Sequence, residues 1–244
     1  MTTRKEKRIL NEIKELNNDA SILANSGIYF YCDESNINNV YALLIGTSDT
    51  PYEKGFYFFK FTYPDTYPMQ PPLAKYCTQG KLINPQTNQL YSVRFNPNLY
   101  TCGKVCLSML NTWAGPGWVP TNTIMNVLVA IQAIVLNPDP LINEPGYENA
   151  AKKELKMYNN ILEYANIKIS VCEMITKTPP EFCMFKDILH ENFMKNIDFY
   201  RNFIKEKKIE FKHATFDSSA YGMKLTPDYD LLLQEIESIV LKID

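Results

Sequence analysis

The segment NPNLYTCGKVCLSML (residues 96–110) contains two cysteines, Cys102 and Cys106, and no histidine. A cysteine thiolate is a strong nucleophile, but a protease that attacks an amide also needs a histidine as base and acid. Most cysteines in proteins are instead small, buried core residues. If one of these two is reactive, its chemistry has to proceed without an imidazole nearby in the sequence.

The charge balance excludes one class of partner. The chain has 244 residues, with 25 basic and 27 acidic side chains and a formal net charge of −2. A surface that binds duplex nucleic acid normally carries a strong basic excess, so we expect no nucleic-acid partner. The length suits one large domain, or one domain of about 150 residues with an appendage.

Hydrophobic patterning gives no sign of a membrane partner. The longest apolar run, Ile124 to Leu136, is too short to span a bilayer and is interrupted by Asn126 and Gln132. The polar N-terminal stretch also lacks the pattern of a signal peptide. We therefore expect a cytoplasmic protein, with the nucleus as a second location.

The cysteines do not have the spacing of a structural zinc site. There is no C-x2-C pair, and His190 and His213, the two histidines, lie far along the chain from Cys102 and Cys106. A disulfide scaffold is not expected in a chain of this length without a secretion signal. We predict no bound metal.

The first part of the chain predicts a helix followed by an antiparallel meander. The residues expected on the buried face of the helix are Ile9, Leu10, Ile13 and Leu16. Aromatic and β-branched residues then predict four strands, separated by turns rich in Asn, Asp, Pro and Gly, at residues 27–34, 40–47, 55–64 and 72–77.

The rest of the chain changes from irregular to helical. Residues 78–93 are polar and predict an exposed loop or a small hairpin, and residues 94–120 show no period but carry apolar side chains to bury. A helix follows, with a predicted stripe of Ile124, Leu128, Ile131 and Val135, and Asn137, Pro138 and Pro140 end it. Further helices are expected near residues 147–175, 185–208 and 228–242.

The order and spacing of several motifs resemble those of the ubiquitin-conjugating enzymes. After the third strand comes YPMQPP (residues 67–72), then Asn96-Pro97-Asn98, then the G-x-x-C-L pattern of residues 103–107, then Trp-x-Pro at 118–120 and a helix. The segments VRFNPNLY, GKVCLSML, NTWAGPGWVP and NEPGYE are similar to the extended Z-type branch and to the conjugating domain of the giant inhibitor-of-apoptosis protein.

This resemblance implies an α+β fold and a domain division. The ubiquitin-conjugating fold has an N-terminal helix, a four-stranded antiparallel meander, an active-site loop and helices, and here it would carry a helical C-terminal extension. We expect the catalytic core at residues 1–150 and the extension, packed on the core, at residues 151–244. Residues 81–91 form an insertion relative to the Z-like pattern, and a solvated loop is the simplest interpretation.

The resemblance also implies a chemistry. Cys106 matches the cysteine that receives the C-terminus of ubiquitin, or of a ubiquitin-like protein, as a thioester and passes it to a lysine amine. Because the acyl group arrives already activated, no histidine base is needed. No cofactor is implied.

Three neighbouring residues have roles implied by the resemblance. Asn98 matches the residue that stabilises the oxyanion, although it can also hold the loop through hydrogen bonds. Asn96 stands where the general family has a histidine and is expected to brace the same loop. Asp139 matches the acidic residue that orients the incoming lysine, and a plain turn residue at the helix end is the alternative.

The implied partners are an activating enzyme, a ligase and a protein substrate. The activating enzyme would dock on the first helix and the ligase on two loops, and a solvated polar helix face is the alternative for the former. The matching residues are Arg4, Lys5, Lys7 and Arg8 on the helix and Met69, Pro120 and Thr121 in the loops.

Other interpretations stay open at this point. Cys102 is either a bystander or a redox partner that forms a disulfide with Cys106. An inactive ubiquitin-binding adaptor would lack the cysteine, which is present here. A cysteine hydrolase would have to use His190 or His213, and no hydrolase signature surrounds either of them.

Overall fold

A computed structural model describes residues 3–33 and 35–243 of the chain. It begins with helix α1 (Arg4–Asn18), which Thr3 and Glu6 start with a reciprocal capping box, and the short α2 (Ala20–Asn25) follows. Ile9 and Leu16 are buried, but Leu10 is 47% exposed. The predicted stripe was therefore wrong at Leu10, because a helix turns about 100° per residue and carries it away from the face of Ile9.

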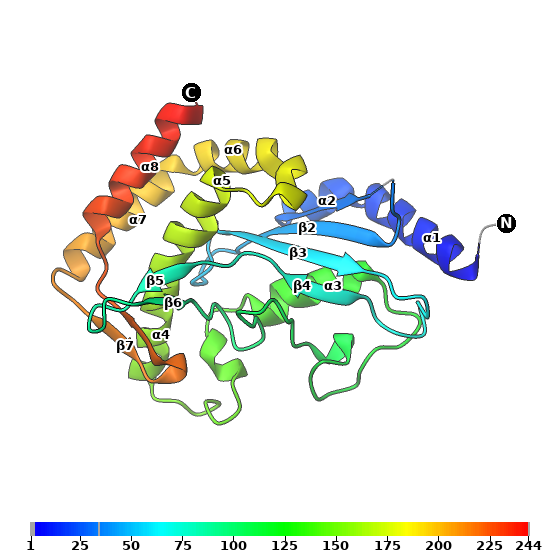
Figure 1. The fold of residues 1–244 in the computed structure, drawn as a ribbon, viewed down its shortest axis with the longest axis horizontal. Helices are drawn as coiled ribbons and strands as arrows, with labels where there is room; N and C mark the ends of the chain where they lie inside the picture. Colours follow the sequence, from blue (N-terminus) through cyan, green and yellow to red (C-terminus); the bar gives the residue numbers. More distant parts are fainter. Residues whose placement is uncertain (1–2, 34, 244) are drawn as a thin grey trace.

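The predicted four-stranded antiparallel meander is confirmed. Each strand pairs with the strands that come directly before and after it in the sequence. Figure 1 shows the sheet at the centre of the molecule. The strands are β1 (Ile28–Cys32), β2 (Asn39–Ile45), β3 (Phe56–Thr62) and β4 (Leu73–Tyr76).

Both faces of the central strands are covered, which explains their almost continuous apolar sequence. On one face, the ring of Phe182 stacks on Phe58 at 4.6 Å between ring centroids and meets Tyr41 edge-on at 5.6 Å. Side chains of the other face, such as Phe59, belong to the same buried cluster as Leu128 of helix α3 (Ile124–Ala130). Phe182 comes from a 3₁₀ segment, η5 (Pro180–Phe185).

The middle of the chain contains the predicted irregular segment and helix. Residues 78–93 form the small hairpin β5 (Lys81–Ile83) and β6 (Leu90–Ser92), so the insertion is an ordered hairpin. The short η1 (Ser108–Leu110) lies within the irregular segment. Helix α3 (Ile124–Ala130) continues as a π-helical turn, η2 (Ile131–Val135), and η3 (Pro140–Asn143) follows.

The C-terminal part is mostly helical, as predicted, with two differences. The expected helix at 185–208 is divided at Asn196 into α6 (Lys186–Lys195) and α7 (Ile197–Glu210). A hairpin of β7 (Phe216–Ser218) and β8 (Met223–Leu225), joined by η6 (Ala220–Gly222), lies where we expected only a connection. Three-residue strands are too short to show a period in the sequence. The other helical elements are α4 (Lys152–Ala165), η4 (Asn166–Glu173), α5 (Met174–Thr176) and α8 (Tyr229–Ile243).

The C-terminal helices contact the turn between β2 and β3. The buried Asn166 side chain accepts a hydrogen bond from the Tyr57 hydroxyl at 2.6 Å and donates one to the Glu53 carbonyl at 2.8 Å. The Tyr200 hydroxyl donates to the Lys54 carbonyl at 2.8 Å. In Figure 1 helices α7 and α8 lie at the opposite end of the molecule from α1. No helix of the described residues is long and apolar enough to cross a membrane.

Candidate functional site

Asn96 anchors the segment that precedes the two cysteines. Its side-chain amide donates hydrogen bonds to the Val135 carbonyl at 2.6 Å and to the Tyr52 hydroxyl at 3.0 Å. Its side-chain oxygen accepts the backbone N–H of Asn98 at 2.8 Å. All of these groups are buried, so each bond would be costly to lose. Asn96 therefore braces the segment, as the sequence predicted.

Asn98 and Cys106 are joined by two hydrogen bonds. The Asn98 Nδ2 donates to the Cys106 carbonyl at 2.7 Å, and the Cys106 N–H donates to the Asn98 carbonyl at 2.8 Å. An amide nitrogen carries two protons, so one N–H of Asn98 is left for another acceptor. The structure therefore brings these two predicted residues together, with Asn98 in a bracing geometry in this state.

The two cysteines differ in exposure. Cys106 is 1% exposed, whereas Cys102 is exposed, and both are free thiols. Between them Gly103 has a φ of +93°, and a Cβ atom there would lie 3.1 Å from both the Lys75 Cγ and the Tyr76 carbonyl oxygen. A glycine is needed at this turn because its backbone is left-handed and the neighbouring strand is close.

The residues after Cys106 are held by Thr112. Its hydroxyl accepts the Leu107 N–H at 2.9 Å and lies 2.8 Å from the Val105 carbonyl, to which it donates. The backbone on both sides of Cys106 is thus tied to one side chain. The role of Thr112 could not be predicted from the sequence, because a single threonine in an irregular segment carries no pattern.

Asp139 lies outside this network. It is exposed, and its backbone carbonyl accepts the Ile142 N–H at 3.2 Å. Its carboxylate makes no hydrogen bond or ion pair within residues 3–33 and 35–243. The helix-end geometry fits the turn role, and the catalytic role remains a prediction.

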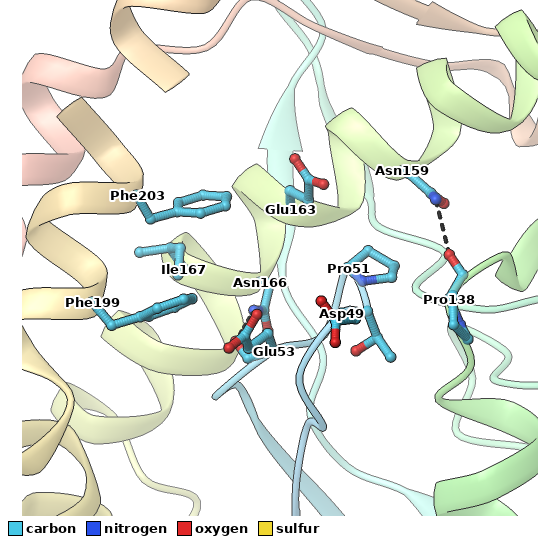
Figure 2. Close-up of a pocket in the computed structure, with 11 residues that line it drawn as sticks. Asp49, Pro51, Glu53, Pro138, Asn159, Glu163, Asn166, Ile167, Phe199 and Phe203 are labelled. Atoms are coloured by element: carbon cyan, nitrogen blue, oxygen red, sulfur yellow. Dashed lines mark hydrogen bonds between the residues drawn. The ribbon is translucent and has the colours of Figure 1, made fainter. Parts of the chain in front are cut away.

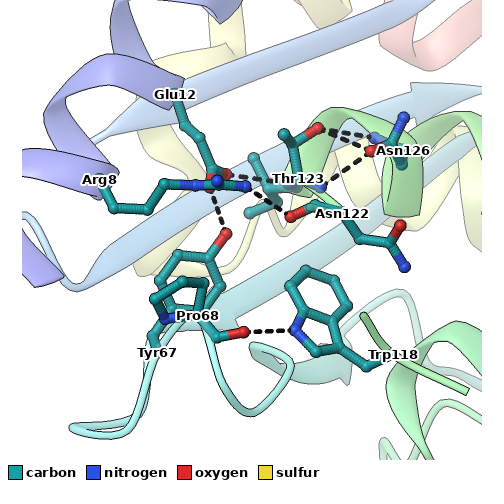
Figure 3. Close-up of polar contacts among 9 residues, drawn as sticks. Arg8, Glu12, Tyr67, Pro68, Trp118, Asn122, Thr123 and Asn126 are labelled. Carbon is teal, nitrogen blue, oxygen red and sulfur yellow. Dashed lines mark hydrogen bonds and ion pairs between the residues drawn. The ribbon is translucent and has the colours of Figure 1, made fainter. Parts of the chain in front are cut away.

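A buried carboxylate joins the first helix to the two predicted partner loops. Glu12, 2% exposed, accepts hydrogen bonds from the Arg8 Nε at 2.5 Å, the Ile124 N–H at 3.1 Å and the Tyr67 hydroxyl. Arg8 also donates to the Asn122 carbonyl at 2.8 Å. Figure 3 shows these contacts converging between α1, the Tyr67 loop and the start of α3.

Trp118 holds the two predicted partner loops side by side. Its indole N–H donates to the Pro68 carbonyl at 2.8 Å, as Figure 3 shows, and its ring lies 5.9 Å from that of Tyr67. Trp118 is 8% exposed, so it packs inside the structure between the two loops. The tips of the two loops, Met69 with Pro120 and Thr121, are exposed.

The structure divides the basic residues predicted on α1 into two pairs. Lys5 binds the Tyr63 carbonyl and the Asp65 carboxylate, each at 3.2 Å, and Arg8 binds Glu12. Arg4 and Lys7 are exposed. Within the described residues, Arg4 and Lys7 are therefore the members of this set that form no ion pair.

A contact between the C-terminal hairpin and the site was not predicted from the sequence. The Arg94 guanidinium lies 3.6 Å from the centroid of the Tyr100 ring and 5.1 Å from that of Tyr221. It donates to the carbonyls of Asn96 at 3.1 Å and Pro97 at 2.7 Å. Arg94 and Tyr221 are far apart in the sequence, and nothing in either local segment indicates this pairing.

A separate cavity of about 300 Å³, shown in Figure 2, does not have Cys106 in its lining. It is bounded by the β2–β3 turn, α4, η4 and α7, and its lining includes Asp49, Glu53 and Glu163. Two of these carboxylates are already paired, Glu53 with Lys54 at 2.7 Å and Glu163 with Lys207 at 2.6 Å. Among the described residues, no group of three or more His, Cys, Asp or Glu side chains could hold a metal ion.

The arrangement supports acyl transfer better than hydrolysis. A thiol, a side-chain amide and a braced loop are together, and both histidines lie in the C-terminal part, at α6 and just after α7. An amide donor can stabilise an oxyanion on an acyl group bound to the thiol. Cleavage of an amide would additionally need a base, for which the structure supplies no imidazole near Cys106 in the described residues.

Comparison with known proteins supports the same interpretation of the site. A family model described as "Ubiquitin-conjugating enzyme" matches residues 8–165. The human protein "Ubiquitin-conjugating enzyme E2 Z" is 36% identical over 218 residues, which are 89% of this chain and 58% of that protein. The human "Dual E2 ubiquitin-conjugating enzyme/E3 ubiquitin-protein ligase BIRC6" is 35% identical over 196 residues, 77% of this chain and 4% of that protein.

A plant relative is similar to the same degree. The Arabidopsis thaliana protein "Probable ubiquitin-conjugating enzyme E2 25" is 36% identical over 212 residues, which cover 80% of this chain and 32% of that protein. The chain thus spans little more than half the length of the E2 Z relative and a smaller part of the other two.

Proposed function

Because the chain belongs to the ubiquitin-conjugating enzyme family, we propose that it carries ubiquitin or a ubiquitin-like protein as a thioester on Cys106 and transfers it to a lysine amine. The observation that carries this proposal is the pair of hydrogen bonds, 2.7 and 2.8 Å long, that joins Asn98 to Cys106. The modifier would be activated at the expense of ATP by a separate activating enzyme.

The first step is an exchange between two thioesters. The Cys106 thiolate attacks the carbonyl carbon of the modifier's C-terminus, a new C–S bond forms, and the cysteine of the activating enzyme leaves as a thiolate. Bonds of the same type form and break, so the step is nearly balanced and needs no protein base. Since Cys106 is 1% exposed, its surroundings have to open before the sulfur reaches the carbonyl carbon.

The second step is aminolysis. The neutral lysine amine attacks the thioester carbonyl, the tetrahedral oxyanion collapses, the C–S bond breaks, and Cys106 is released as a thiolate. The second N–H of Asn98 Nδ2 is the donor available to the oxyanion. Asp139, exposed immediately before η3, would orient the amine and accept its proton.

The partner surfaces follow from exposure. Arg4 and Lys7 are exposed on α1 and would meet the activating enzyme, whereas Lys5 and Arg8 would act mainly by holding the helix in place. Met69 and the Pro120–Thr121 pair, held side by side through Trp118 and Pro68, would form a small apolar surface for a ligase.

A thioester-loading assay tests the proposal. The protein is incubated with an activating enzyme, ATP and ubiquitin, or a ubiquitin-like protein, and analysed on a non-reducing gel. We expect an adduct that a thiol reagent removes, that Cys106→Ala abolishes, and that the matched variant Cys102→Ala retains. Absence of any adduct with every modifier and activating enzyme tried would refute it.

A further inference from the structure

The C-terminal hairpin reaches the segment that positions Asn98. This hairpin, residues 216–225, consists of β7, η6 and β8 and lies beside α4 in Figure 1. It contacts Arg94 at two places, through the Tyr221 ring and through the Met223 sulfur, which accepts the Arg94 backbone N–H at 3.4 Å. A second element of the C-terminal part also binds Arg94: the Tyr158 hydroxyl of α4 donates to its carbonyl at 2.6 Å.

Arg94 links the hairpin to the backbone that precedes Asn98. Its Nε and Nη2 donate to the carbonyls of Asn96 and Pro97 at 3.1 and 2.7 Å. A guanidinium is a planar fork, so two donors from one side chain fix both the position and the orientation of these peptide groups. The next residue is Asn98, whose side-chain amide donates to the Cys106 carbonyl.

The side chain of Tyr221 is itself held by a hydrogen bond. Its backbone has a φ of +60° in η6, and its hydroxyl donates to the Glu144 carboxylate at 2.5 Å. Burial, followed by the bond to Glu144, raises the pKa of the Tyr221 hydroxyl, so it stays a donor at neutral pH. The ring is therefore fixed where it meets the guanidinium of Arg94.

We propose that Arg94 is a positioning residue for Asn98, and that the C-terminal hairpin holds Arg94 in place through Tyr221. The hairpin thereby sets the rate at which the thioester on Cys106 is transferred. This inference rests on the proposed function, because it assigns Arg94 and Tyr221 to the aminolysis step of that function.

The test measures discharge from protein that already carries the modifier. The thioester is formed, the activating enzyme is stopped by removal of ATP, and free lysine is added at several concentrations and pH values. A misplaced group can slow a reaction severely without being removed. We expect Arg94→Ala to lower the maximal discharge rate about tenfold, with little change in the lysine concentration that gives half-maximal rate.

A conservative variant and a hairpin variant extend the test. Arg94→Lys keeps the charge but cannot form the two-donor fork, so we expect incomplete rescue of the rate. Tyr221→Ala removes the ring and its hydroxyl bond to Glu144 from a partly exposed turn, so the chain should still fold, and we expect about a threefold slower discharge because the cation–π contact with Arg94 is lost. Arg201→Ala, which breaks a 2.6 Å pair with Glu237 in the helical extension, is the matched control and should discharge at the normal rate.

A double-variant cycle separates positioning from general destabilisation. If Arg94 acts through Asn98, Arg94→Ala should have little further effect on the discharge rate when Asn98 is already alanine. A purely structural role would instead slow both backgrounds by the same factor. The inference would be overturned if the fold-reductions in discharge rate caused by Arg94→Ala and by Asn98→Ala multiplied in the double variant. It would also be overturned if Arg94→Ala and Tyr221→Ala both discharged at the normal rate. Failure of the unaltered chain to form any thioester would overturn the proposed function instead.

Discussion

The buried carboxylate of Glu12 provides a sharp test of how the partner surfaces are held. Glu12→Gln keeps the shape of the side chain but removes its charge and replaces one oxygen with an NH2 group. If the remaining oxygen keeps the bonds from Arg8 and Tyr67, the new NH2 group faces the Ile124 N–H, which now donates to Glu12 at 3.1 Å. Two donors then meet in a buried site.

The magnitude follows from these contacts. An unsatisfied buried N–H costs ~1–3 kcal/mol, and each bond that loses its charged acceptor weakens by ~1 kcal/mol. Relief from burying the carboxylate offsets part of this cost. We expect Glu12→Gln to lower the free energy of unfolding by about 2–3 kcal/mol, which for a chain of this length shifts Tm down by about 4–12 °C.

Urea and thermal unfolding, followed by tryptophan fluorescence, measure this loss. Glu15→Gln is the matched control, because Glu15 lies exposed on the same helix and its change should stay within about 0.5 kcal/mol. A loss for Glu12→Gln as small as that of the control would refute the argument. Arg8→Ala combined with Glu12→Gln should cost less than the sum of the two single changes, because the variants share one contact.

Two further predictions concern titrating groups. When alkylation at pH 7.5 is followed over time by mass spectrometry, the exposed Cys102 and Cys183 should react before Cys32 and Cys77. The reason is that burial raises the pKa of the Cys32 and Cys77 thiols to about 11. Equal alkylation rates for the four cysteines would contradict this prediction. Burial also raises the pKa of the half-buried Glu173, so its ionisation destabilises the fold above that pKa, and this penalty is lost as the pH falls through it. Glu173→Gln should therefore raise Tm at pH 7, and a gain that fails to shrink on acidification would contradict the assignment.

Local signals predicted the core of the fold well. Aromatic and β-branched runs separated by turn residues located all four strands of the sheet, because each signal lies within the strand that it describes. The face of α1 was less well predicted, since Leu10 follows Ile9 in the sequence but points elsewhere on the helix. The C-terminal hairpin was missed because its short strands are defined by their contacts with each other and with α4.

In the site, too, the sequence predicted only those residues that belong to a local pattern. The match to the family motif selected Asn98 and Cys106, because Asn-Pro-Asn and G-x-x-C-L are both local sequence patterns; the loop between them is closed by their own backbone and side-chain bonds. Glu12, Thr112 and Arg94 could not be selected, because each acts by joining segments that no local pattern relates.

The contacts of Arg94 connect the C-terminal part of the chain to the backbone that precedes Asn98. Arg94 lies two residues before Asn96, so Arg94 and Asn96 constrain the same short stretch of backbone from two directions. Asn96 ties it to the Val135 carbonyl in η2, and Arg94 ties it to Tyr221 in the hairpin. Each of these two contacts restrains the peptide before Asn98 in a different direction, so neither contact can replace the other. Loss of the contact with Tyr221 alone would leave the bond to Val135 in place, and we expect the thioester then to form but to discharge slowly.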